Sequence, residues 1–412
     1  MKRSNYFLHI SALLLVFSLS VLTACATAQT GDTNGGVVGA ARQLAANLNA
    51  MNQGSARANG DTVTLINWIG LGRDNKNKNI TVPAGVTLDM TAYTGDKGPN
   101  AQIALSSGAT LTVNGTVNTR AWGIGVEGDA SAATINGSGT INLLSKGELL
   151  YGIDNGRKLT LDGVKLVGLA DNSHSLVQVN EGGEFVMQNG AITGNTRTGG
   201  ERAESGGIRV WKGTFIMSGG EISSNIAQGS KQGRGGGVYV DGGKFIMSGG
   251  EISGNSAIGE GGEGRAGGVY VSEGTFTMSD GAISGNTAKG GDGTMGGGVW
   301  TWRVTFTMTG GTISGNTAQG IGNRLSGGGV KLEDSAFTMS GGRIQGSTDS
   351  DGFSANTTSD GNRWGSALFS EGNQYEGAGA RWGTGGTYTK GGIPQTGGSN
   401  IGNTNDTLIA IP

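Results

Sequence analysis

One eight-residue phrase recurs along the second half of the chain and limits the folds that the chain can adopt. The phrase Phe-Ile-Met-Ser-Gly-Gly-Glu-Ile at 215–222 returns in altered form every 30 or 31 residues, and a more divergent copy precedes it. The phenylalanines that begin the six copies are Phe185, Phe215, Phe245, Phe276, Phe306 and Phe337. A unit repeated at a fixed period is typical of a solenoid, in which each unit buries its apolar face against its neighbours.

Each repeat is built from short strands and glycine turns. Apolar residues alternate with others, as in Val238-x-Val240 and Phe245-x-Met247, which is the period of a half-buried strand. The glycine triplet at 235–237 supplies a turn in which φ can be positive. A β-propeller blade needs about 40–50 residues, so the all-β alternative that fits is a parallel β-helix, here of about ten or eleven coils.

An asparagine follows the last isoleucine of each repeat by three residues. These residues are Asn195, Asn225, Asn255, Asn286 and Asn316. On coils stacked about 4.8 Å apart, their amides can hydrogen-bond to one another along the axis. Ser347 has this position after Ile344, so we expect the asparagine ladder to end there.

These features resemble the internal ladder of right-handed parallel β-helices, the architecture of pectate lyases and many bacterial surface proteins. The resemblance covers roughly residues 60 to 390. The Gly-Gly-x-Ile phrase also resembles the repeats of polymorphic outer-membrane proteins. The sequence is most similar to lipid-anchored bacterial β-helix repeat lipoproteins, a group defined by fold more than by activity.

The first residues have the pattern of an export signal. Basic residues at 2–3 precede a short apolar run at 10–22, shorter than the ~20 residues of a membrane span. The following Leu-Thr-Ala-Cys at 22–25 resembles the lipobox of bacterial lipoproteins, which implies cleavage before Cys25, acylation of Cys25 and delivery to the outer membrane. An ordinary signal peptide cut at a nearby alanine is the alternative reading.

The chain divides into five expected segments. Leu44, Leu48 and Met51 have helical spacing and predict a short amphipathic helix that plugs the first coil. The expected segments are a signal peptide at 1–24, a lipidated tether at 25–36, an N-terminal cap at 37–59, the parallel β-helix at 60–346 with regular 30-residue coils from about 177, and an irregular last coil with a C-terminal cap at 347–412.

The composition excludes several kinds of site. The 29 basic and 31 acidic residues leave a net charge of −2, which argues against a nucleic-acid partner. His9 and His174 are the only histidines and Cys25 is the only cysteine, so neither a multi-histidine nor a CxxC metal site is possible. We expect no metal and no cofactor.

One pair of carboxylates is a candidate for catalysis. Glu221 and Glu251 occupy the same position in adjacent repeats, and a retaining glycosidase needs two carboxyl groups ~5–5.5 Å apart. The competing interpretation is that glutamate is a polar filler in a column that continues with Ala282, Thr312 and Arg343.

An outward column of aromatic residues is a candidate for ligand binding. Tyr239, Tyr270 and Trp300 fall between the paired valines of successive repeats. Two residues further along, the neighbouring column contains Trp211, Asp241 and Trp302. Exposed aromatic faces beside carboxylates suit a saccharide. The alternative is that these aromatics only pair across strands.

Three classes of function remain open. We expect a lipid-anchored protein of the outer membrane, exposed at the cell surface and acting in binding or adhesion, with the membrane and a polysaccharide or host-surface molecule as partners. Loops of nine or ten residues after each asparagine, as at 226–234, leave one corner of the solenoid and are either binding loops or spacers. A polysaccharide lyase or glycoside hydrolase and a purely structural envelope protein are the alternatives.

Overall fold

The structure is a computed structural model that describes residues 33–72, 78–92, 101–128, 131–291, 293–321, 325–345, 356–358, 368–371, 387–390 and 393–396. The predicted signal peptide and Cys25 lie outside these residues, as does most of the predicted C-terminal cap.

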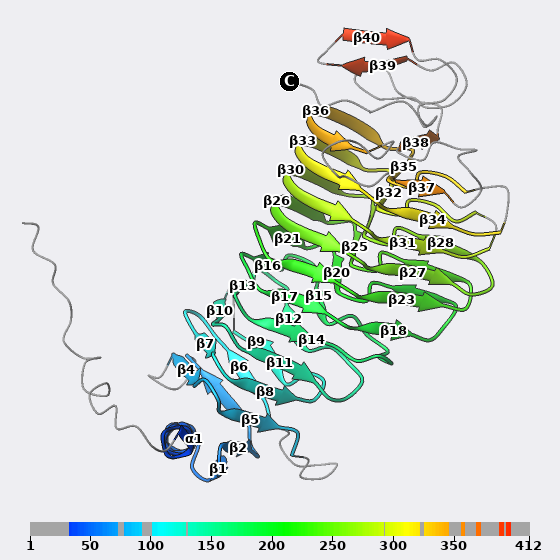
Figure 1. Cartoon of the computed structure of the whole chain (residues 1–412). Coiled ribbons are helices and arrows are strands. Elements are labelled where there is room, and N and C mark those ends of the chain that lie inside the picture. Colours follow the sequence, from blue (N-terminus) through cyan, green and yellow to red (C-terminus); the bar gives the residue numbers. More distant parts are fainter. Residues whose placement is uncertain are drawn as a thin grey trace, which may run out of the picture.

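The chain winds into a parallel β-solenoid of about nine turns (Figure 1). The predicted parallel β-helix is therefore confirmed. The expected ten or eleven coils exceed this number because the passes at the two ends contribute strands without completing a turn among the described residues. One antiparallel hairpin, β39 (Thr387–Lys390) with β40 (Ile393–Thr396), is drawn beyond the last coil.

Two long sheets form the walls of the solenoid. Sheet A contains eighteen strands. They are β1 (Ala56–Asn59), β2 (Thr62–Leu65), β4 (Asn79–Val82), β5 (Thr87–Met90), β7 (Thr110–Val113), β8 (Thr116–Thr119), β10 (Ala132–Asn136), β11 (Thr140–Leu143), β13 (Lys158–Asp162), β14 (Lys165–Val167), β16 (Glu184–Met187), β17 (Ala191–Thr193), β21 (Thr214–Met217), β22 (Glu221–Ser223), β26 (Lys244–Ser253), β30 (Thr275–Ser284), β33 (Thr305–Ser314) and β36 (Ala336–Ile344). Sheet B contains eleven strands, one from each successive pass. They are β3 (Ile69–Leu71), β6 (Ile103–Leu105), β9 (Ile124–Val126), β12 (Leu150–Ile153), β15 (Val177–Val179), β20 (Ile208–Trp211), β25 (Val238–Asp241), β29 (Val269–Ser272), β32 (Val299–Trp302), β35 (Val330–Glu333) and β38 (Leu368–Glu371).

Among the described residues, the strands of two smaller sheets, which we call the wing, all come from the later coils. Sheet C consists of β18 (Thr196–Thr198), β23 (Ile226–Gly229), β27 (Ser256–Gly259), β31 (Thr287–Lys289), β34 (Thr317–Gln319) and β37 (Thr357–Thr358). Sheet D consists of β19 (Arg202–Glu204), β24 (Gln232–Arg234) and β28 (Glu263–Arg265). The segments expected as loops after each asparagine are thus largely strands, because each pairs in parallel with the same segment one coil further on.

The core is a set of identical side chains stacked along the axis. The six phenylalanines of the repeat are buried, and consecutive rings lie 4.5–5.7 Å apart. The paired valines and the last isoleucine of each repeat are buried beside them. Inward residues of parallel strands meet their equivalents one coil away, so the repeat itself creates a continuous narrow core.

A helix covers the first coil. The predicted helix is present as α1 (Thr33–Met51), which begins earlier than the expected residue 37. Leu44 and Leu48 are buried against the first strands, and Met51 packs at the edge of this contact. The helix thereby shields apolar side chains that the open end of a solenoid would otherwise expose.

The asparagine ladder forms the hydrogen bonds of the turn between sheet A and sheet C in the later coils. Asn225 donates from Nδ2 to Asn255 Oδ1 at 3.1 Å and to the carbonyl of Ile192 at 2.8 Å, and the same two bonds recur in the following coils. Asn316 donates to Asn356 at 2.9 Å, so the ladder does not end at Ser347 as expected. The 30-residue period of the repeat does not predict Asn356 as a partner, because Asn356 follows Asn316 by 40 residues.

Candidate functional site

The aromatic column that the sequence offered for ligand binding is buried. Tyr239, Tyr270 and Trp300 stack with ring centroids 4.9 and 4.5 Å apart, but their exposed fractions are only 4, 3 and 1%. We call these three residues the buried strip. The expectation of an exposed saccharide surface is wrong at these positions.

The wing is the reason for this burial. Arg234 of β24 lies over the ring of Tyr270 at 5.6 Å, and Arg265 of β28 lies over Trp300 at 5.3 Å. Burial raises the pKa of the hydroxyl groups of both Tyr239 and Tyr270. The strip is therefore a second, smaller core between sheet B and the wing, closed by stacked guanidinium groups.

The neighbouring column remains at the surface in part. Trp211, Asp241, Ser272 and Trp302 lie in register on four successive strands of sheet B. Trp211 is 37% exposed, whereas Trp302 is partly buried against the buried strip. Asp241 accepts a hydrogen bond from Ser272 at 2.9 Å. The hydrogen-bonded pair Asp241 and Ser272 thus separates the indole rings of Trp211 and Trp302.

The described residues of the early coils contribute no strand to the wing, and there the outer face of sheet B carries a different set of aromatics. Gly70, Ala104 and Gly125 are in register on β3, β6 and β9. The ring of Trp68 lies on Gly70, where an added Cβ would come within 2.4 Å of it, and the ring of Tyr151 lies on Gly125, at 2.3 Å from such a Cβ. We call these five residues the platform. Gly70 and Gly125 must be glycine, because a side chain at either position would collide with the ring that covers it.

Trp122 lies in the turn before β9, the strand that contributes Gly125 to the platform. Its side chain is 45% exposed, and its φ of 57° is a left-handed value that bulky residues rarely adopt. The ring contacts His174 edge-on at 5.9 Å, and its backbone N–H donates to the carbonyl of Glu148 at 2.8 Å. The backbone of Trp122 therefore adopts an unfavourable conformation, and its large apolar ring remains exposed to solvent.

Charged groups gather where the platform meets the first coil of the wing. Arg197 of β18 donates to the carbonyl of Glu204, and Arg209 of β20 donates from Nε to the carboxylate of Glu204 at 3.3 Å. Both arginines also act on the carboxyl of Glu148 through their charge. Burial raises the pKa of its carboxyl to about 6, although Arg209 and Arg197 attract the ionised form. We call Glu148, Arg197, Glu204 and Arg209 the step cluster.

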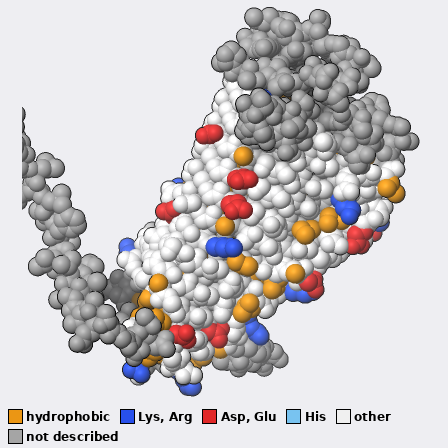
Figure 2. All heavy atoms as spheres, in the orientation of Figure 1, with side chains coloured by type: hydrophobic (Ala, Val, Ile, Leu, Met, Phe, Trp, Pro, Cys, Tyr) orange, Lys and Arg blue, Asp and Glu red, His pale blue; other side chains and the backbone are white. Residues whose placement is uncertain are grey.

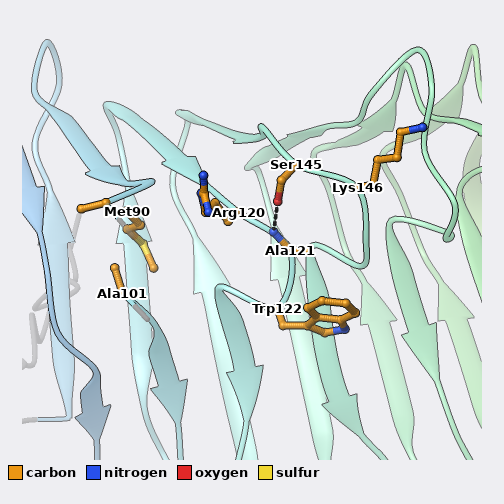
Figure 3. Close-up of a pocket in the computed structure, with 8 residues that line it drawn as sticks. Met90, Ala101, Arg120, Ala121, Trp122, Ser145 and Lys146 are labelled. Atoms are coloured by element: carbon orange, nitrogen blue, oxygen red, sulfur yellow. Dashed lines mark hydrogen bonds between the residues drawn. The ribbon is translucent and has the colours of Figure 1, made fainter. Parts of the chain in front are cut away.

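Trp122 also lines a hollow of about 150 Å³ (Figure 3). It is lined by Met90, Ala92, Ala101, Arg120, Ala121, Trp122, Ser145 and Lys146. The backbone N–H of Ala121 donates to Ser145 Oγ at 2.9 Å, and Lys146 forms an exposed ion pair with Asp171 at 2.7 Å. Trp122 therefore lines the hollow with its side chain and bonds to Glu148 through its backbone.

The carboxylates considered for catalysis lie elsewhere. Glu221 and Glu251 are in register on adjacent strands of sheet A, and both are exposed. Ser284 Oγ donates to Glu251 Oε1 at 3.0 Å. The residues in register on either side of the pair are Ala191 and Ala282, whose side chains offer no polar group for a substrate.

The sequence did not point to Trp68, Trp122, Tyr151 or Glu148. The available signal was a glycine at the outward position of a strand, as at Gly70 and Gly125, which indicates close approach of another group. Glu148 has no local signal in the sequence.

Within the described residues, no three His, Cys, Asp or Glu side chains are grouped closely enough to hold a metal ion. No helix in the same part of the chain is long and apolar enough to cross a membrane. Acidic and basic side chains are scattered over the visible face, mostly among uncharged ones (Figure 2).

No protein family, curated protein or solved structure matches the chain.

Proposed function

We propose that the protein is a lipid-anchored surface protein of the bacterial outer membrane that binds saccharides at the platform and Trp122. The observation that carries this proposal is the 45% exposed ring of Trp122, held with positive φ outside the wing. A pyranose ring lays its apolar face on an aromatic ring, and the edge groups of both remain free to hydrogen-bond.

The neighbouring residues fit such a ligand. Trp68 and Tyr151 offer further aromatic rings on the same sheet face, and both are only partly buried. The step cluster supplies donors and acceptors for sugar hydroxyls at one end of the platform. Binding sites of this kind combine aromatic surface with a few convergent polar groups.

A panel of immobilised glycans, probed with the full-length protein in detergent, tests the proposal. We expect binding to at least one glycan, weakened about thirtyfold in Trp122→Ala, as for an aromatic hot spot. Trp211→Ala is the matched control, because Trp211 is also exposed but lies away from the platform. Equal affinity of Trp122→Ala and wild type would refute the proposal, as would the absence of any bound glycan. Shortening of bound glycans would instead favour an enzyme.

The membrane anchor is tested separately. We infer that Cys25 is acylated, because the only cysteine of the chain has the position that a lipobox requires. Radiolabelled fatty acid should enter wild type and not Cys25→Ser. Protease treatment of intact cells should then remove the solenoid if the protein is displayed at the surface, and leave it whole if it faces the periplasm.

A further inference from the structure

The hollow that Trp122 lines has an apolar wall. Met90 and Ala101 are buried, and Ala92 and Ala121 are half-buried at its surface. Its volume of about 150 Å³ is well below the ~300–1,000 Å³ of pockets that enclose a whole small ligand. The hollow therefore has room for a substituent of a sugar rather than for the whole sugar ring.

Polar groups border the same hollow. Ser145 Oγ accepts a hydrogen bond from the backbone N–H of Ala121 at 2.9 Å, and its own hydroxyl hydrogen can be donated to a ligand. Arg120 is exposed, and its guanidinium group has five N–H donors. The amino group of Lys146 bonds to Asp171 at 2.7 Å and points away from the other lining residues (Figure 3). The hollow thus combines an apolar wall with donors that suit an uncharged oxygen.

The turn that carries Trp122 is fixed against the next coil. The backbone N–H of Trp122 donates to the carbonyl of Glu148 at 2.8 Å, as that of Ala121 does to Ser145. At Gly147 an added Cβ would come within 2.3 Å of the Ala121 side chain and 3.5 Å of the Trp122 ring. The hollow and the exposed ring therefore keep one mutual position, and a ligand that uses both needs no rearrangement of the turn.

We propose that the hollow takes the acetamido group of an N-acetylated saccharide whose ring lies on Trp122. This inference rests on the proposed saccharide-binding function and names its substrate class. The acetyl methyl group packs against Met90 and the alanines, where it is removed from water. The acetyl carbonyl accepts a hydrogen bond from Ser145 or Arg120.

Other substituents at the same position of the sugar fit the hollow less well. A hydroxyl group is too short to cover the apolar wall and leaves it in contact with water. A carboxylate would lose hydration against Met90 and Ala101, which is costly for a charged group. The charge of Lys146 is already matched by Asp171, so Arg120 alone would offset that cost.

The test compares a β-1,4-linked tetramer of N-acetylglucosamine with the β-1,4-linked tetramer of glucose, which differ only in the acetamido group. Affinities of the full-length protein in detergent are measured by calorimetry. We expect the N-acetylated tetramer to bind roughly tenfold more tightly. Trp122→Ala should weaken the binding of both tetramers, because the sugar ring lies on Trp122 in either case.

Two variants fill the hollow without touching Trp122. Ala92→Leu adds a side chain from a half-buried position, and Ala101→Leu adds one from a buried position in case the first leaves the hollow open. Each should remove the preference for the N-acetylated tetramer and keep the affinity for the glucose tetramer. Ala191→Leu, at a half-buried position on β17 of sheet A, is the matched control and should keep the wild-type preference. Circular dichroism checks that each variant is folded.

The outcomes separate this inference from the function on which it rests. Equal affinity of wild type for the two tetramers would overturn the role of the hollow and leave saccharide binding standing. A preference that persists in both folded variants would also overturn it, as would tighter binding of a glucuronic acid tetramer than of the N-acetylated one. Failure of both tetramers and of every glycan in the panel would instead remove the proposed function.

Discussion

Buried side-chain amides determine where each later coil can turn out of sheet A into the wing. Asn255 accepts from the backbone N–H of Asn225 at 3.0 Å and donates to the carbonyl of Ile222 at 2.8 Å. Its amide also bonds to the asparagines before and after it, at 3.1 and 3.0 Å. Each asparagine thus satisfies buried backbone groups that no sheet ladder reaches.

Asn255→Ala should therefore lower the free energy of unfolding by ~3 kcal/mol or more, because it leaves several buried donors and acceptors unpaired. Chemical denaturation measures this loss. Ser256→Ala, at the next position and only half buried, is the control and should stay within about 0.5 kcal/mol of wild type. Equal midpoints for both variants would contradict the role given to the ladder.

At the scale of the element, the wing determines which aromatics meet solvent. Trp300 is buried by β28 and the residue that follows it, Ala266, whereas Trp122 precedes the wing and is exposed. The alternation of Val and aromatic residues correctly predicted the strands and their outward column. It could not predict that residues 35 or 36 positions earlier in the chain lie over that column, because this depends on pairing between coils.

Trp300→Ala should accordingly destabilise the protein by ~3–5 kcal/mol through the cavity that it leaves under the wing. It should not change the affinity for a glycan that binds at the platform. Trp211→Ala, on the exposed neighbouring column, should cost much less stability. Loss of glycan binding in a folded Trp300→Ala protein would show that the wing opens and that the strip is a binding surface after all.

At the scale of the whole molecule, stability is distributed along one axis. Each coil contacts mainly the coil before and the coil after it, so damage should stay close to its origin. The period, the inward columns and the N-terminal helix were predictable from the sequence because each depends on residues close in the chain. Asn356 and the step cluster were not, because a break in the period precedes Asn356 and the members of the step cluster lie on two separate coils.

Phe276→Ala should cost ~3–5 kcal/mol, since Phe276 is fully buried between two stacked rings. Limited proteolysis should cut first between residues 245 and 306, the coils on either side. The exposed Thr275→Ala is the control on the same strand. New cuts spread evenly along the chain would argue against coil-by-coil stability.

Hydroxyl-radical footprinting of the tryptophans tests the central claim most directly, because the oxidation rate reports the exposure of each ring. In the free protein, Trp122 and Trp211 should be oxidised quickly and Trp300 slowly. A saturating glycan should slow oxidation of Trp122 and leave Trp211 unchanged. Rapid oxidation of Trp300, or an unchanged rate at Trp122 with the glycan bound, would contradict a binding surface that lies on the early coils outside the wing.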